Sequence, residues 1–258
     1  MARQAGRTPD PKKIAETGDI FFFYRPRIDS AGAQGLEDVQ RFYIALRPAR
    51  KRPRIRLLTI GRKRLPDLSS HERSWGFVDL VTGSTRLLAR VLGEESYETK
   101  TRGRRHLPAA RPAGEGVYAL ARLGDKLFLA YERELPRRPG AVQRAINIAQ
   151  RGSYALSIKN PLASTPPGVG LREDEEADYP PELLREFRGR RFASEDVRLL
   201  DYPGAEFVLI GADPEPERAL AIEMPAERET ADSADIFRTL HLARERQPIE
   251  PLLSGSWR

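Results

Sequence analysis

The sequence predicts an α+β fold that consists mainly of antiparallel strands and contains few short helices. Three observations lead to this prediction. Short apolar runs rich in aromatic and β-branched residues recur along the chain between Gly, Pro and Asp residues, as is typical of strands. Helical periodicity appears only in short segments. Several sequence patterns also recur in the same order in two parts of the chain, which indicates two related β-rich lobes.

The first part of the chain contains four predicted strands and one predicted helix. Each strand is an apolar run that ends at a Gly, a Pro or a polar turn. The helix is expected to begin after Ser84, a favourable N-terminal cap, and to stop at Gly93. The predicted strands comprise residues 18–26, 39–48, 54–61 and 74–82.

The second part begins with a predicted β-hairpin. Its strands, at 116–123 and 126–136, are joined by a turn that contains Gly124, a residue that tolerates the left-handed backbone conformation. A connection rich in Pro, Gly and acidic residues is expected at 161–181. The other predicted elements are strands within 145–161 and at 206–212, and helices at 180–187 and 230–246.

Four patterns recur in order and divide the chain. Gly-Asp (18–19 and 124–125), Val-Gln-Arg (39–41 and 142–144), the Leu-Leu pairs at 87–88 and 183–184, and Arg-Gly-Arg-Arg (102–105 and 188–191) follow the same order in both parts, and we interpret this order as an internal duplication. The last helix and the tail are expected to pack back across the body through Ile236, Leu240, Leu252, Leu253 and Trp257. The expected organisation is a flexible N-terminus at 1–17, lobes at 18–123 and 124–213, and a C-terminal helix and tail at 214–258.

Composition restricts the classes of function. The chain has 258 residues and no cysteine, which excludes disulfides, thiolate metal sites and a cysteine nucleophile. The net charge of +7 favours anionic partners, although arginine makes up 37 of the 44 basic residues, a bias that a GC-rich genome also produces. No signal peptide or membrane-spanning run appears, so we expect a cytoplasmic protein without a membrane partner. The oligomeric state stays open.

Common catalytic signatures are missing from the sequence. It contains no P-loop, no complete G-x-G-x-x-G pattern and no G-x-S-x-G elbow. The three histidines do not have the spacing of metal ligands. We therefore expect no cofactor and no metal, and we favour a protein that is not an enzyme. The most enzyme-like stretch is "SSHERSWGF", in which His71 and Glu72 are the candidate catalytic residues.

The strongest local signal is the segment from 47 to 64, which has nine Lys or Arg residues and no acidic residue. The planar guanidinium of arginine suits phosphate, and Arg54 and Arg56 are expected on one face of a strand. A solvated edge strand protected by its charge is the alternative. The candidate polyanion-binding residues are Arg50, Lys51, Arg52, Arg54, Arg56, Arg62, Lys63 and Arg64, with Arg102, Arg104 and Arg105 of the first Arg-Gly-Arg-Arg segment.

Longer stretches carry a resemblance to known sequences. "GDIFFFYRP", "VQRFYI", "HERSWGFVD" and "LLDYPGAEFVLIGA" resemble a family of conserved bacterial proteins of unknown function, over residues 18–213 and the tail. That resemblance implies no activity, ligand or catalytic residue. "GDIFFFY" is also similar to one strand of EVE and other PUA-like modules, which implies nucleic-acid binding.

These observations leave three classes of function. We favour non-catalytic binding of an anionic ligand, with nucleic acid first, through the basic segment and the two Arg-Gly-Arg-Arg segments. The second class is an enzyme that acts on a small anionic substrate in a cleft between the lobes. The third is a structural or partner-binding protein. A continuous positive surface favours the first class, and a concave pocket with convergent polar groups favours the second.

Overall fold

The structure is a computed structural model. It describes residues 14–51, 53–101, 103–164, 170–193, 196–213, 215, 234–242 and 248–257.

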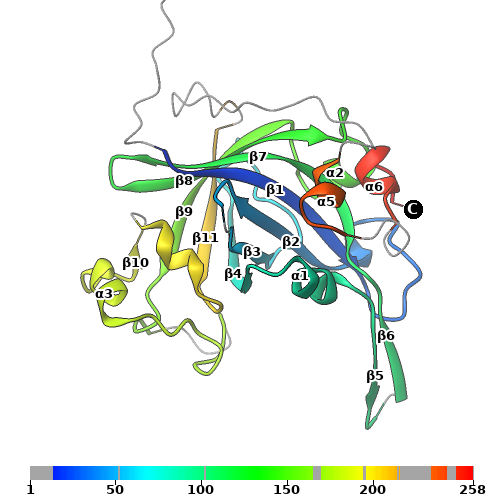
Figure 1. The fold of residues 1–258 in the computed structure, drawn as a ribbon, viewed down its shortest axis with the longest axis horizontal. Helices are drawn as coiled ribbons and strands as arrows, with labels where there is room; N and C mark the ends of the chain where they lie inside the picture. The colour runs from blue at the N-terminus through cyan, green and yellow to red at the C-terminus, as the bar shows by residue number, and fades with distance from the viewer. Residues whose placement is uncertain are drawn as a thin grey trace, which may run out of the picture.

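Eight antiparallel strands form one closed barrel (Figure 1). The strands follow one another around the barrel in the order β1-β2-β3-β4-β11-β9-β8-β7, and β7 pairs with β1. Closure pairs both edges of every strand, which removes the unpaired backbone groups of an open sheet. The strands are β1 (Ile14–Pro26), β2 (Val39–Pro48), β3 (Ile55–Ile60), β4 (Arg73–Thr82), β7 (Arg111–Leu123), β8 (Lys126–Leu135), β9 (Arg151–Lys159) and β11 (Glu206–Asp213).

The other elements are short. Strands β5 (Glu95–Thr99) and β6 (Gly103–Leu107) form a separate two-stranded ribbon that projects from the barrel in Figure 1. Strand β10 (Phe192–Ala193) pairs with the end of β9. The helices are α1 (Thr85–Leu92), α2 (Ala141–Ala145), α3 (Pro181–Leu184), α5 (Asp235–Arg238) and α6 (Glu250–Leu253), with 3-10 turns η1 (Leu36–Asp38), η2 (Arg185–Phe187) and η3 (Val197–Asp201).

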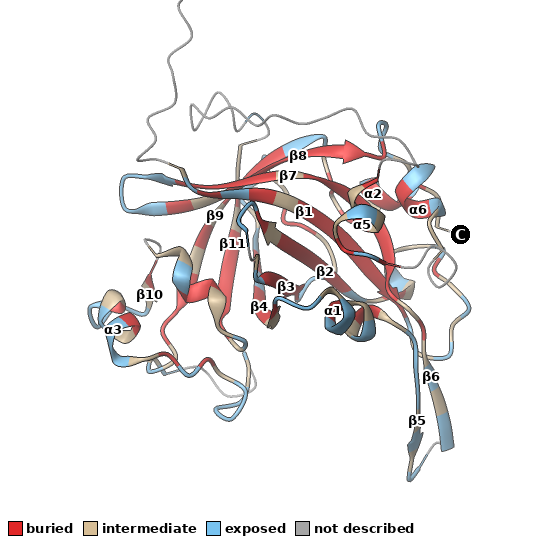
Figure 2. Cartoon of the chain, viewed as in Figure 1, coloured by how far each residue is buried: buried red, intermediate tan, exposed pale blue. Residues whose placement is uncertain are grey.

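Alternate side chains of the barrel strands supply two cores. In β1, Ile20, Phe22 and Tyr24 belong to the main core, whereas Phe21 and Phe23 belong to a second core. The second core also contains buried side chains of α1, α5 and α6, which lie beside the barrel wall (Figure 1). Because both faces of β1 are covered there, residues 20–24 form a continuous apolar run without alternation, and the strand is buried along most of its length in Figure 2.

The two ends of the barrel differ. The end where β1 begins and where the hairpin between β7 and β8 turns is called the pocket end. We call the loop end the opposite one, which carries the connection at 61–72 and helix α2. Helix α3 and the turns η2 and η3 connect β9 to β11 at the pocket end.

The structure confirms the mainly antiparallel β architecture with few short helices. Strand β2 has the predicted bounds, and α1 begins directly after Ser84, whose hydroxyl accepts a hydrogen bond from the Leu87 amide at 3.2 Å. The sequence analysis did not identify the ribbon or β10. The ribbon strands have almost no apolar side chain to bury, and β10 has two residues, so neither gives the periodic pattern of a strand.

Both expected lobes contribute to one closed sheet. Strand β7, at the end of the first expected lobe, pairs with β1 on one side and with β8 of the second expected lobe on the other. The boundary at 123–124 therefore falls in a hairpin turn. The strand order instead divides the barrel into two consecutive meanders, β1 to β4 and then β7, β8, β9 and β11.

The internal duplication is not shown by this arrangement. Gly18 and Asp19 lie within β1, where they pair with Pro48 and Arg47 of β2. Their expected counterpart, Gly124, lies in the turn between β7 and β8 and has a φ of 63°. The two Gly-Asp patterns therefore serve different purposes, one inside a strand and the other in a tight turn.

A continuous C-terminal helix is also not shown. Of the expected helix at 230–246, residues 230–233 and 243–246 lie outside the described part of the chain, and α5 comprises four residues. The side chains of Ile236, Leu240 and Leu252 are buried, whereas Leu253 is exposed. The Trp257 ring meets the Tyr24 ring edge-on at 5.1 Å between centroids. Within the described ranges, no helix is long and apolar enough to span a membrane.

Glu115 of β7 fixes the start of α5. Its carboxylate is fully buried and accepts hydrogen bonds from the backbone amides of Asp235 and Ile236 at 3.0 and 2.9 Å. We predict that Glu115→Ala lowers the free energy of unfolding by about 1–3 kcal/mol, because it leaves buried amides without an acceptor. Hydrogen exchange of the segment 234–242 should become faster. Glu37→Ala, an equal charge change at an exposed position, is the control, and equal exchange in both variants would contradict the prediction.

Candidate functional site

The basic segment does not form one face. Arg50, Lys51 and Arg54 are exposed on the connection between β2 and β3 at the pocket end. Arg62, Lys63 and Arg64 follow β3 at the loop end. The six residues of β3 separate the two groups by about 20 Å, at roughly 3.3 Å per residue. The length of the strand therefore prevents these side chains from acting as one patch.

Arg56 is a correction to the expected exposed face. It is fully buried, because its position on β3 points into the barrel together with Leu58 and Ile60. Its guanidinium forms ion pairs with Glu16 of β1 and with Asp201 of η3, the latter at 2.7 Å between Nη2 and Oδ1. The Arg56 side chain is therefore part of the interior, and it does not share the exposure of Arg54.

Two of the three basic residues that follow β3 at the loop end share one carboxylate. Arg62 and Arg64 both form ion pairs with Glu72, at 2.5 and 2.8 Å. The backbone amide of Asp67 also donates to Glu72, and this hydrogen bond together with the two arginines lowers the pKa of the Glu72 carboxyl. Nδ1 of His71 lies 2.9 Å from the carbonyl oxygen of Gly211. The two candidate catalytic residues thus belong to the anchoring of the 61–72 connection.

The first Arg-Gly-Arg-Arg segment lies on the ribbon. Arg104 is exposed, and Arg105 forms an ion pair with Asp29 at 2.7 Å. Arg52 and Arg102 lie outside the described residues. Neither Arg104 nor Arg105 lines the cavity at the pocket end.

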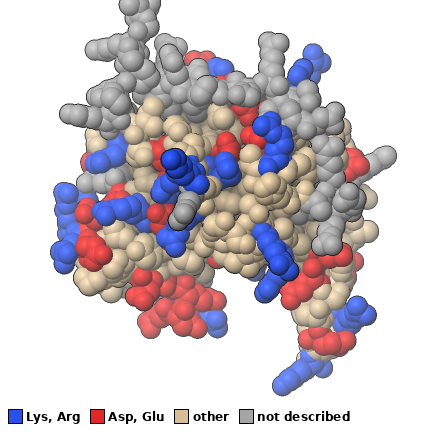
Figure 3. All heavy atoms as spheres, viewed as in Figure 1, with Lys and Arg blue, Asp and Glu red and all other residues tan. Residues whose placement is uncertain are grey.

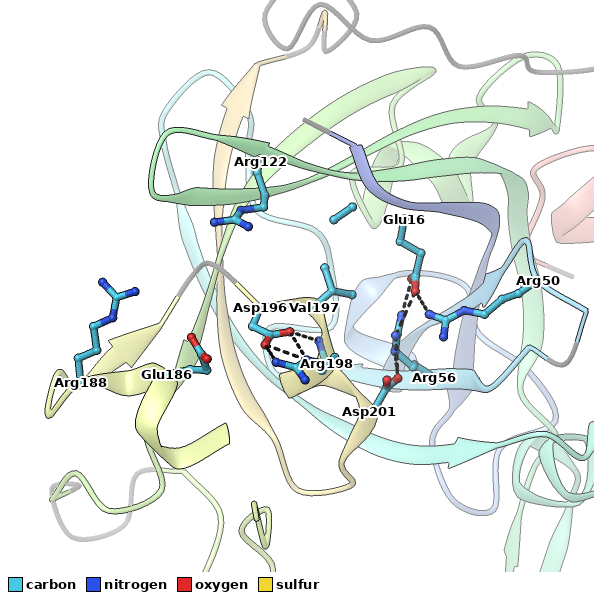
Figure 4. A pocket seen from close by; sticks show the side chains of 11 residues that line it. Glu16, Arg50, Arg56, Arg122, Glu186, Arg188, Asp196, Val197, Arg198 and Asp201 are labelled. Atoms are coloured by element: carbon cyan, nitrogen blue, oxygen red, sulfur yellow. Dashed lines mark hydrogen bonds and ion pairs between the residues drawn. The ribbon is translucent and has the colours of Figure 1, made fainter. Parts of the chain in front are cut away.

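A cavity of about 600 Å³ opens at the pocket end (Figure 4). Charged side chains from β1, β3, β7, the connection between β2 and β3, and the segment from η2 to η3 converge on it. Two of the candidate residues selected from the sequence, Arg50 and Arg56, line this cavity. Arg188, from the second Arg-Gly-Arg-Arg segment, also lines it. The lining residues are Ala15, Glu16, Arg50, Arg56, Arg122, Glu186, Arg188, Asp196, Val197, Arg198 and Asp201.

Carboxylates form the floor of this pocket, and arginines form its rim. The side chains of Glu16, Asp196 and Asp201 are only 6%, 16% and 19% exposed. Those of Arg50 and Arg198, which pair with Glu16 and Asp196, are 49% and 65% exposed. A molecule that enters from solvent therefore meets guanidinium groups before it meets carboxylates.

Arg122 adds a positive charge to the rim. Its side chain is exposed, and in the described part of the chain no carboxylate forms an ion pair with it. In Figure 4 it extends from the end of β7 on the side of the pocket opposite Asp201. With five arginines and four carboxylates in the lining, Arg122 accounts for the positive excess.

The Glu16 carboxylate of the floor is held in the ionised form. Burial by itself raises the pKa of Glu16, but the hydrogen bonds and charge of Arg56, together with hydrogen bonds from Tyr118 and Arg50, bring it below the ordinary value. The Tyr118 hydroxyl donates to Glu16 at 2.7 Å, and burial beside this carboxylate raises the pKa of Tyr118. A carboxylate with a lowered pKa whose oxygens already accept hydrogen bonds from Arg56, Tyr118 and Arg50 is a weak general base.

Sequence reasoning missed most of the pocket. The inward orientation of Glu16 could have been inferred from the sequence. Glu16 precedes Ile20 by four residues, and residues four apart in an extended strand lie on the same face. The partners Arg56 and Asp201 are 145 positions apart, and no local pattern connects them. Arg122 and Arg198 lie at a strand end and in a short 3-10 turn, where exposed arginines are common.

The buried ion pairs give a first prediction for this site. Arg56→Met leaves the buried Glu16 and Asp201 carboxylates without their shared partner. Removal of one member of a buried pair typically costs about 3–5 kcal/mol, and we expect a loss of that size in denaturant unfolding. Arg54→Met, an equal charge change on an exposed neighbour, should change stability little. Similar losses in the two variants would contradict the assignment.

The pKa of Glu16 gives a second prediction. Because the pKa of Glu16 in the folded protein lies below its ordinary value of 4.5, ionised Glu16 stabilises the fold fully above pH 4.5. That contribution is lost as the pH falls through the folded pKa. We expect Glu16→Gln to be less stable than the unmodified protein at neutral pH, and the difference should shrink in acid. Denaturation midpoints measured from neutral pH into acid test this, and a constant difference would contradict it.

Comparisons with models of protein families, with curated proteins and with solved structures each gave no match. The resemblances drawn from sequence motifs therefore stay predictions, and the geometry of the pocket carries the functional argument.

Proposed function

We propose that the protein binds an anionic ligand, without catalysis, in the mouth of the barrel at its pocket end. The observation that carries this proposal is the layered charge of the pocket, in which exposed arginines stand above buried carboxylates. Anions are attracted to the rim, while the carboxylate floor is shielded by the arginines that it binds. The forked guanidinium matches the oxygen geometry of phosphate and carboxylate groups.

The size of the cavity supports a ligand group that enters it. A volume of about 600 Å³ falls within the roughly 300–1,000 Å³ of typical small-molecule sites. On the face seen in Figure 3, Lys and Arg side chains are interspersed with Asp and Glu and form no continuous basic stripe. The pocket therefore supplies the specific contacts, and the surface around it supplies weaker attraction.

Among anionic ligands we place nucleic acid first. Lys51 and Arg54 are exposed on the same connection as Arg50, next to the pocket rim, and extend the positive charge beyond it. A chain of phosphates can use both the rim and this extension, whereas a single small anion uses the rim alone. A free nucleotide or another small phosphate compound is the alternative ligand.

The test is titration of labelled single-stranded and duplex oligonucleotides at several salt concentrations, with nucleotides and inorganic phosphate as competitors. If Arg50, Arg122, Arg188 and Arg198 each contact a phosphate, the log-log salt slope for a single strand should be about −3, at roughly −0.7 per contact. Arg122→Ser should weaken binding and flatten the slope by about 0.7.

Arg104→Ser is the matched control, because it removes one exposed arginine from the ribbon, away from the pocket. It should bind as the unmodified protein does. Competition by nucleotides without oligonucleotide binding would assign the pocket to a small phosphate compound. The absence of binding to every anion in the series, or equal losses in the two variants, would overturn the proposal.

A further inference from the structure

Arg133 of β8 is a buried cation without a carboxylate partner. Its side chain is fully buried, and it faces the barrel interior at the loop end, two residues beyond Tyr131. Nη2 donates to the side-chain oxygen of Gln150 at 2.9 Å, and Nε donates to the Ala149 carbonyl at 3.3 Å. Nη1 has no hydrogen-bond partner. In the described part of the chain, no carboxylate forms an ion pair with this guanidinium.

Arg25 shows how this fold otherwise satisfies a buried guanidinium. It is 2% exposed and also has no carboxylate partner among the described residues, but each of its nitrogens has an acceptor. Its Nη1 donates to the carbonyls of Gly93 and Pro108, Nη2 to Val91 and Nε to the Tyr43 hydroxyl. Arg133 therefore differs from Arg25 in one specific respect, the unused donor at Nη1.

The loop end of the interior holds further polar side chains. The hydroxyls of Tyr24, Ser74 and Tyr154 are buried and, within the described residues, make no hydrogen bond of normal geometry. All three residues lie toward the loop end of their strands. Burial also lowers the pKa of Arg133, in keeping with a guanidinium that has been removed from water. Such a group ordinarily requires an acceptor, and a negative charge serves best.

We propose that the barrel binds a small inorganic anion of the chloride class at Nη1 of Arg133. A monovalent anion balances the single positive charge of the guanidinium, and the complete burial of Arg133 excludes a large ligand. A halide accepts hydrogen bonds and donates none, which suits the buried N–H groups of Nη1 that have no partner within the described residues. This site is separate from the pocket, which lies at the other end of the barrel, and it does not depend on the proposed function.

The first experiment measures the unfolding equilibrium against chloride concentration, with gluconate keeping the ionic strength constant. For an ion that binds only the folded protein, the logarithm of the unfolding constant falls with a slope near −1 against the logarithm of chloride concentration, once chloride exceeds its dissociation constant. We expect this slope for the unmodified protein and a slope near zero for Arg133→Met. A zero slope in the unmodified protein would overturn the proposal.

Two controls locate the ion. Arg54→Met removes the same charge from the surface, and Arg122→Ser alters the rim of the pocket, so both should keep the slope of the unmodified protein. Loss of the slope in Arg122→Ser, or its persistence in Arg133→Met, would place the ion elsewhere and overturn the assignment. Oligonucleotide binding by Arg133→Met should be unchanged, which separates this test from that of the pocket.

A second measurement uses only the unmodified protein, so it tests the proposal even if Arg133→Met fails to fold. Crystals of the unmodified protein grown in bromide should show an anomalous scattering peak beside Nη1 of Arg133. Density without an anomalous signal at that position would identify a water molecule and would overturn the proposal.

Discussion

The closure of the sheet through β9 is the constraint on which the rest of this structure depends. Residues 154–156 of β9 pair with β11 along one edge and with β8 along the other. Without the second pairing, β8 and β9 would each have an exposed edge. Closure also encloses the inward side chains. An eight-stranded barrel has an interior just wide enough for side chains to fill, and here aromatic rings such as Phe22, Phe42 and Tyr131 occupy it. Charged groups therefore gather at the two ends.

Each end of the barrel buries an arginine on an inward-facing position, and the two are compensated differently. Arg56 at the pocket end has two carboxylates, so its charge is balanced within the protein. Arg133 at the loop end donates hydrogen bonds to a backbone carbonyl and to a side-chain amide oxygen, both neutral, so its charge is not balanced by these contacts. A balanced buried pair mainly fixes geometry, because the cost of removing both charges from water offsets most of their attraction. An unbalanced charge instead favours whatever anion reaches it.

The barrel strands were predictable from sequence, but the direction of their side chains was not. Apolar runs bounded by turn residues identify β1, β2, β3 and β4 because burial demands such runs. All six residues of β3 are buried, however, so its pattern does not reveal which side faces the interior. Arg56 was therefore placed on an exposed face with Arg54. Its partner Asp201 lies in a short turn far along the chain, and only closure of the barrel brings the two together.

Paired arginines at the rim have a consequence for binding that net charge alone does not reveal. Arg50 is held by Glu16 and Arg198 by Asp196, so both guanidiniums already occupy fixed positions. A ligand that binds them loses less free energy to the ordering of side chains, since each rotamer-rich side chain that must be immobilised costs about 0.5–1.5 kcal/mol. The same carboxylates weaken the attraction for an anion. If the pocket binds an anion as proposed, Arg122, which has no such pair within the described residues, would supply the attraction, and its paired neighbours would supply the geometry. Affinity should thus depend mainly on the unpaired arginine, and selectivity among anions on the paired ones.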